Sequence, residues 1–173
     1  PTIVRLADGV ELHVEVDEAH ASAAWRDLTV VFVHGYALNQ DCFHYQRLAL
    51  RGSVRLVLYD QRSHGRSGRG SPESSTMAQL ADDLHAVLDA VAPSGPVVLV
   101  GHSMGGMTIL ELARTAPQLF GDRVVGGGGK SVAAHEEAQQ ADGIEQEDIE
   151  GRLAHAVDAH GGEDEDAGVE LRA

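Results

Sequence analysis

Apolar and polar residues follow two different periods along the first part of this chain of 173 residues. Residues 2–6 and 10–16 alternate apolar and polar side chains around a short Asp-Gly turn, which predicts a β-hairpin. Residues 29–33, 54–59 and 97–100 are instead almost continuously apolar and rich in Val. That second pattern is typical of strands that are buried on both faces of a mostly parallel sheet.

Segments with helical spacing separate these apolar runs. Residues 41–50 and 75–92 carry apolar side chains at intervals of three and four, and another such run begins at Met104. Prolines follow the second and third of these segments and end them, at Pro93 and Pro117. Strands that are themselves apolar and alternate with helices predict an α/β fold with a doubly wound, mostly parallel sheet.

The sequence Gly-His-Ser-Met-Gly at 101–105 stands where an apolar strand meets a helix. A serine on so tight a turn is held in a strained backbone conformation with its hydroxyl outside the sheet, and the two glycines avoid collisions with the neighbouring chain. The helix that begins at Met104 directs N–H groups and its positive dipole end toward anything bound to the serine. This layout predicts that Ser103 is a nucleophile in acyl transfer, the alternative being a turn that merely exposes a serine.

Three motifs occur together in the first part of the chain. They are His-Gly at 34–35, the polar loop Asp-Gln-Arg-Ser-His-Gly-Arg-Ser at 60–67, and Gly-His-Ser-Met-Gly-Gly at 101–106. In order and spacing they resemble the α/β-hydrolase fold family, and especially its serine esterase- and lipase-like members. The resemblance covers residues 1–125 and implies the same fold for that part of the chain.

The resemblance also implies roles for three residues. Ser103 matches the nucleophile of the family, and the backbone N–H groups of Tyr36 and Met104 match the oxyanion hole, where they would stabilise a tetrahedral oxyanion. Related epoxide hydrolases and dehalogenases have Asp in place of this serine, so the resemblance implies a hydrolase for a carboxylic ester or related acyl substrate. Non-haem haloperoxidases and C–C bond hydrolases of the same fold share the motifs and remain alternatives.

The other chemically versatile side chains of residues 1–125 are predicted to be structural. His34 is expected to shape its loop, because a catalytic histidine must face the serine and have its own acidic partner. The remaining expectations are packing or hydrogen bonding for His102, a loop tie for Asp60 and His64, a solvated face or a loop contact for Asp82 and Asp83, and a small partly buried side chain for Cys42. No group has metal-ligand spacing, and no cofactor is predicted.

Composition excludes some partners and compartments. The net charge of −14 is poorly suited to a partner that is a nucleic acid. The single cysteine cannot form an internal disulfide, which favours a reducing compartment and predicts a cytoplasmic protein. No apolar run is long enough to span a membrane and no signal-peptide pattern is present. The oligomeric state stays open.

The pattern changes near residue 125. Residues 123–125 begin like a strand, but four glycines, a lysine and a serine follow, where a strand favours β-branched residues. This Gly-Gly-Gly-Gly-Lys-Ser sequence lacks the first glycine of a phosphate-binding loop, so nucleotide binding is not predicted. Residues 126–173 have no aromatic side chain and are expected to form an atypical Gly-, Ala- and acid-rich tail, with polar helices at 131–141 and 147–159 and disorder at 161–166.

A catalytic histidine and acid are not identified. The tail contains histidines and aspartates, but no strand pattern precedes them to fix them opposite Ser103; they are His135, His155, His160, Asp142, Asp148 and Asp158. The abrupt change suggests a truncated or frame-shifted reading of a longer gene. The sequence therefore predicts a serine hydrolase that is incomplete and weak in this chain, with a non-catalytic binding protein or an inactive fragment as the alternatives.

Overall fold

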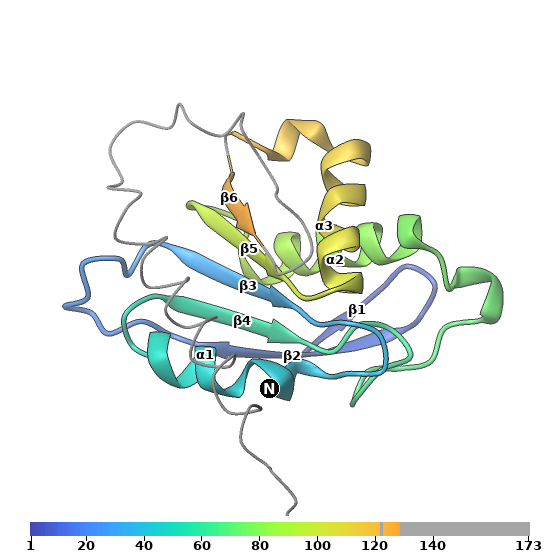
Figure 1. Ribbon diagram of the computed structural model, residues 1–173, viewed down its shortest axis with the longest axis horizontal. Coiled ribbons are helices and arrows are strands. Elements are labelled where there is room, and N and C mark those ends of the chain that lie inside the picture. Colours follow the sequence, from blue (N-terminus) through green and yellow to red (C-terminus); the bar gives the residue numbers. More distant parts are fainter. Residues whose placement is uncertain (122, 129–173) are drawn as a thin grey trace, which may run out of the picture.

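The computed structural model describes residues 1–121 and 123–128, which form one mixed sheet flanked by helices (Figure 1). The strands are β1 (Thr2–Arg5), β2 (Glu11–Asp17), β3 (Thr29–Val33), β4 (Arg55–Tyr59), β5 (Val97–Gly101) and β6 (Val124–Gly128). The helices are α1 (His44–Leu50), α2 (Met77–Val91) and α3 (Met104–Thr115), with short 3-10 helices at Gln40–Phe43, Pro72–Ser74 and Pro117–Leu119. The α/β class is confirmed.

The sheet has the order β1-β2-β4-β3-β5-β6. β1 and β2 form the predicted antiparallel hairpin, and β2 is also antiparallel to β4. β4, β3, β5 and β6 are parallel to one another. The apolar strands of the sequence are therefore the parallel ones, and the carboxyl ends of β3, β4 and β5 meet at one edge.

Each central strand contributes alternate side chains to two separate cores. Val31 and Val33 of β3 belong to the core that α2 and α3 cover, whereas Val30 and Phe32 belong to the core that α1 covers. Figure 1 shows the same layers, with α1 on one face of the sheet and α2 and α3 on the other. Because both faces are covered, β3 has no polar-facing side, which explains its continuous apolar sequence.

The segment predicted as one helix at 41–50 is divided in the structure. A 3-10 helix spans Gln40–Phe43, and α1 follows it directly. The Asn39 side chain accepts a hydrogen bond from the Asp41 N–H, at 2.9 Å, and so caps the start of the 3-10 helix.

β6 extends into the glycine run. It pairs with β5 as far as Gly128, three residues beyond the predicted change at residue 125, with an irregularity between Val97 and Val98 of β5. A Cβ added at Gly126 would lie 3.5 Å from the Val98 Cγ2 atom, an ordinary contact. Backbone pairing with a buried neighbour is thus sufficient to hold a strand whose side chains add little. The division of the chain into 1–125 and 126–173 stays a prediction, and the helices expected in the tail lie outside the described residues.

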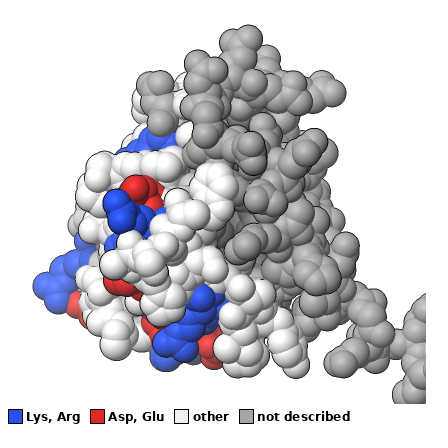
Figure 2. Space-filling model, turned by 90° about the vertical axis from the view of Figure 1, so that its left-hand side faces the viewer, with Lys and Arg blue, Asp and Glu red and all other residues white. Residues whose placement is uncertain are grey.

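The described surface carries charges of both signs. On the face drawn in Figure 2, basic and acidic side chains of the described residues stand next to one another, with no extended patch of one sign among them. In the described ranges, no helix combines the length and the apolar character that a membrane span requires.

Candidate active site

Ser103 lies on the tight turn between β5 and α3. Its backbone is in the left-handed region, with φ 49° and ψ −113°, a conformation that a residue with a side chain rarely adopts. The side chain is exposed and makes no capping hydrogen bond to the helix that follows. The turn thus presents the hydroxyl group away from its own backbone, as the sequence analysis predicted for a nucleophile.

Close backbone contacts behind the turn explain why glycine occupies positions 101 and 105, two residues before and two residues after Ser103. A Cβ at Gly101 would lie 2.5 Å from the Gly106 backbone nitrogen, and one at Gly105 only 1.9 Å from the carbonyl oxygen of Val33 in β3. Real Cβ atoms essentially never approach another heavy atom within 3.0 Å. Both glycines are therefore required for α3 to pack this closely on the ends of β5 and β3.

The two backbone N–H groups expected at the oxyanion hole follow adjacent strands. β3 and β5 are parallel neighbours, with Val33 opposite Gly101, and the His102 N–H donates to the Val33 carbonyl at 3.0 Å. Tyr36 lies just after β3, and Met104 is the first residue of α3. Among the described residues, no backbone carbonyl accepts a hydrogen bond from either of these two N–H groups.

His34 is fully buried and hydrogen-bonded at both ring nitrogens. Its Nδ1 atom is 2.8 Å from the Gly35 carbonyl oxygen, and its Nε2 atom accepts from the Gln61 N–H at 2.9 Å. This arrangement requires the neutral ring with the proton on Nδ1. Burial lowers the pKa of His34, which keeps the ring neutral. The geometry agrees with the loop-shaping role and leaves His34 no free nitrogen for a catalytic proton transfer.

Asp60 and His64 join the loops that follow β3 and β4. The buried carboxylate of Asp60 accepts from the backbone N–H groups of Gln40 and Arg66, each at 2.8 Å. The His64 ring contacts Tyr36 edge to face, at 5.9 Å between ring centroids, and its Nδ1 atom is 2.8 Å from the Arg62 carbonyl oxygen. The expected loop tie is present, and it holds the segment that carries Tyr36.

Asp83 is buried and pairs with a residue of the 60–67 loop. Its carboxylate accepts two hydrogen bonds from the Arg62 guanidinium, at 2.5 and 2.7 Å, and both side chains are only 2% exposed. Arg62 also bonds to Asp8 at 2.9 Å. The hydrogen bonds to Asp83 raise the pKa of Arg62. Of the two alternatives for Asp83, the structure has the loop contact, whereas Asp82 beside it is exposed.

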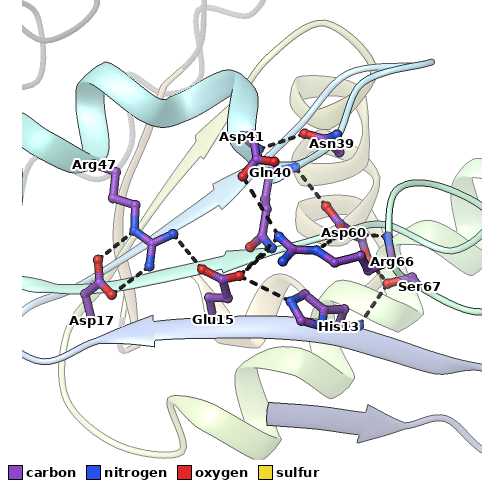
Figure 3. A network of polar contacts seen from close by, with 10 residues as sticks. All are labelled: His13, Glu15, Asp17, Asn39, Gln40, Asp41, Arg47, Asp60, Arg66 and Ser67. Carbon is purple, nitrogen blue, oxygen red and sulfur yellow. Dashed lines mark hydrogen bonds and ion pairs between the residues drawn. The ribbon is translucent and has the colours of Figure 1, made fainter. Parts of the chain in front are cut away.

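A second polar network lies on the α1 side of the sheet (Figure 3). Glu15 of β2 is at its centre, accepting from Arg47 of α1 at 2.6 Å and from the Gln40 side chain at 3.3 Å. Arg66 forms an ion pair with Glu15 at 3.1 Å, and Arg47 also binds Asp17 through two hydrogen bonds of 2.7 Å. Hydrogen bonds from Arg47 lower the pKa of both carboxyl groups. No sequence pattern predicts this network, which fixes α1 and the 60–67 loop against β2.

No described side chain hydrogen-bonds to the Ser103 hydroxyl group. The histidines and aspartates of the tail that the sequence analysis considered as base and acid lie outside the described residues. Within 1–121 and 123–128, no group of three His, Cys, Asp or Glu residues is arranged to hold a metal ion. The described part of the candidate site therefore consists of the Ser103 turn and the two N–H groups predicted for an oxyanion hole.

A serine with a positive φ between a parallel strand and a helix, backed by glycines, is typical of the nucleophile turn of α/β hydrolases. Residues 30–167 match the model of the alpha/beta hydrolase family, and the chain belongs to that family. The resemblance predicted from the three motifs is thereby confirmed. The match also extends past residue 125, into the segment that the sequence analysis considered atypical.

Known proteins similar to this chain have diverse names. The probable oxidoreductase EphD of Mycobacterium tuberculosis is 37% identical over 87 residues, which are 50% of this chain and 15% of that protein. The putative carbamate hydrolase RutD of a Caulobacter species is 34% identical over 108 residues, 62% of this chain and 40% of the relative. A solved esterase from Thermogutta terrifontis is 30% identical, with a TM-score of 0.60 over 73% of this chain and 43% of the esterase. The chain thus spans less than half the length of these relatives.

Proposed function

We propose that this chain carries the nucleophile and the oxyanion hole of a serine hydrolase that acts on a carboxylic ester or a related acyl substrate. The observation that carries the proposal is the left-handed Ser103 at the β5–α3 turn, with glycines behind it where a Cβ atom would collide with backbone atoms. Family membership supports it, as do an esterase and a carbamate hydrolase among the similar proteins.

In the proposed reaction, the Ser103 Oγ atom attacks the carbonyl carbon of the substrate while a base takes the hydroxyl proton. The carbonyl oxygen becomes an oxyanion and accepts hydrogen bonds from the N–H groups of Tyr36 and Met104. The tetrahedral intermediate collapses to an acyl-serine, and the alcohol leaves with the proton from the base. Water then attacks the acyl-serine and releases the carboxylic acid, which restores the serine.

The base is the part of this machinery that the described residues do not supply. Its absence matters, because loss of the histidine from a serine triad typically lowers turnover by about 10⁶-fold. Two histidines of the loops after β3 and β4 are committed elsewhere: His34 is bonded at both nitrogens, and the His64 Nδ1 atom bonds to the Arg62 carbonyl. We therefore propose that the described part by itself has weak activity or none.

The second candidate is a non-catalytic binding protein that keeps the hydrolase site. It is favoured by one observation, the lack of any described hydrogen-bond partner for the Ser103 hydroxyl group. Such a protein would bind an acyl compound without turnover, and its affinity for the ligand would be unchanged by Ser103→Ala.

Intact mass after exposure to a fluorophosphonate tests the proposal. Ser103→Ala is the main comparison, and Ser63→Ala is a matched control, since Ser63 is also an exposed serine in the left-handed region, with φ 63°. Rapid single labelling that is lost only in Ser103→Ala would mean that the serine is activated and that the tail supplies a base. A soluble, folded chain that is not labelled would contradict an activated nucleophile and favour the binding protein.

A further inference from the structure

Gln61 connects the two segments that carry the oxyanion-hole N–H groups. It follows β4, and its side chain is 1% exposed. The Nε2 atom donates to the carbonyl oxygen of His34, at 2.6 Å, and the Oε1 atom accepts from the hydroxyl group of Thr108 in α3, at 3.3 Å. One carboxamide thus bridges the loop after β3 and the first turns of the nucleophile helix.

The chemistry of the neighbours fixes the orientation of this carboxamide. A carbonyl oxygen such as that of His34 can only accept, so the NH₂ group of Gln61 must face it and the oxygen must face Thr108. The Gln61 backbone N–H adds a bond to the His34 Nε2 atom, at 2.9 Å. Gln61 therefore holds His34 at two atoms, and it does so two residues before Tyr36.

The other end of the bridge lies on the helix that carries the second N–H group. Thr108 lies one helical turn after Met104, and its hydroxyl group is 3.0 Å from the Met104 carbonyl oxygen. Both oxygens can only accept, and the hydroxyl group has one proton, so it donates either to the Gln61 Oε1 atom or to the Met104 carbonyl oxygen at any one time, with both acceptors within its reach. Any shift of α3 relative to the β3 loop must stretch or break the bonds of Gln61.

We propose that Gln61 is a positioning residue that sets the separation between the N–H groups of Tyr36 and Met104. This inference rests on the function proposed above, and it deepens that proposal by naming what holds the oxyanion hole in shape. A donor misplaced by about 1 Å loses much of its effect on the transition state, on the order of 10²-fold in rate. A rigid buried bridge between the two donors therefore serves the reaction directly.

Gln40 provides a matched control for the loss of a buried glutamine. It is also 1% exposed and lies in the segment that follows the Tyr36 loop. Its side chain donates to Glu15 of β2, at 3.3 Å, and makes no contact of this kind with α3. Gln40→Leu removes the same chemical group from a similar environment without touching the proposed bridge.

The experiment compares Gln61→Leu with Gln40→Leu in the full chain. The first readout is the second-order rate of Ser103 labelling by a fluorophosphonate, which we expect to fall by about tenfold or more in Gln61→Leu only. The second readout is the rate of backbone hydrogen exchange. We expect this rate to increase in both residues 34–38 and residues 103–108 of Gln61→Leu, and in neither segment of Gln40→Leu. Exchange is independent of catalysis, so it tests the bridge even if the parent chain is not labelled.

Thr108 variants keep the inference testable if Gln61→Leu does not fold. Thr108→Ser retains the hydroxyl group and should keep the exchange pattern and the labelling rate of the parent chain, whereas Thr108→Val should behave like Gln61→Leu. Exchange that rises equally in Gln40→Leu, or that leaves the two segments unchanged in Gln61→Leu, would overturn the inference. A parent chain that resists labelling would instead count against the proposed function alone.

Discussion

Gly105→Ala tests how closely α3 must pack behind the nucleophile. The added Cβ atom would lie 1.9 Å from the carbonyl oxygen of Val33 and 2.9 Å from that of His34. Both are backbone atoms, so no side chain can rotate out of the way. Relief requires α3 and the end of β3 to separate by roughly 1 Å, which well-packed interiors resist.

Two opposing contributions determine how far Gly105→Ala changes the free energy of unfolding. In an unhindered helix, Gly→Ala stabilises by at most about 1 kcal/mol. Forcing extra volume into a packed site costs typically 1–3 kcal/mol, and the upper end applies here because the backbone itself must move, for roughly 3 kcal/mol. The net expectation is a loss of about 2 kcal/mol, which for a chain of this length corresponds to a fall in Tm of about 4–8 °C.

Thermal and urea unfolding measure the stability of Gly105→Ala and of the control variant Gly126→Ala relative to the parent chain. A Cβ at Gly126 would meet only the Val98 Cγ2 atom, at 3.5 Å, so that variant should be as stable as the parent chain or slightly more stable. Fluorophosphonate labelling of folded Gly105→Ala should also be slower, because a displaced α3 carries the Met104 N–H away from Tyr36. Equal stability of Gly105→Ala and the parent chain would refute the packing argument.

Three further predictions concern the supporting side chains. Asp83→Asn should lower the free energy of unfolding in urea by about 3 kcal/mol, because it leaves the buried Arg62 charge poorly compensated, and exposed Asp82→Asn should change it little. Arg47 lowers the pKa of two carboxyl groups of β2 in the folded state, so the stability they contribute is present above their ordinary pKa, about 4, and is lost as pH falls through the lowered values. In Arg47→Met, the free energy of unfolding should therefore fall less steeply as the pH is lowered below about 4. An unchanged pH dependence would contradict the stabilising role assigned to Arg47. Burial raises the pKa of Cys42 to about 11, so its reaction with a disulfide reagent at pH 8 should be many times slower in the folded chain than in urea, whereas equal rates would show an accessible thiolate.

The sequence predicts the structure well where a single segment determines its own conformation. A continuous apolar run such as residues 29–33 predicts burial on both faces, because a strand that met water on one side would alternate. The Gly-x-Ser-x-Gly pattern predicts the turn of Ser103, because the two glycines and the serine all lie within one tight connection. Both predictions depend on neighbours in sequence, and the structure bears out both elements.

Contacts between distant segments were not predictable in the same way. The sequence pattern allows either a solvated face or a loop contact for Asp83, since only the packing of α2 brings it against Arg62. Gln61 carries no signal in the sequence, and its importance comes from two partners that lie on other elements. The strand at 124–128 is likewise decided by its paired neighbour, because its own glycines have low strand preference.

The unfavourable backbone conformations show why the site depends on the whole sheet. Among the described residues, those with a side chain and a positive φ are Ala37, Ser63 and Ser103. They follow β3, β4 and β5, the adjacent parallel strands whose carboxyl ends meet at one edge. Each such residue costs about 1–3 kcal/mol and persists only where surrounding contacts determine it. Open α/β sheets bind their ligands at this edge, so the strain lies where the fold must hold a fixed geometry. The local sequence predicts the strained conformation of Ser103 only. Ala37 and Ser63 gain significance when the strands are assembled, because they place strained backbone in the Tyr36 and Arg62 loops at the same edge of the sheet.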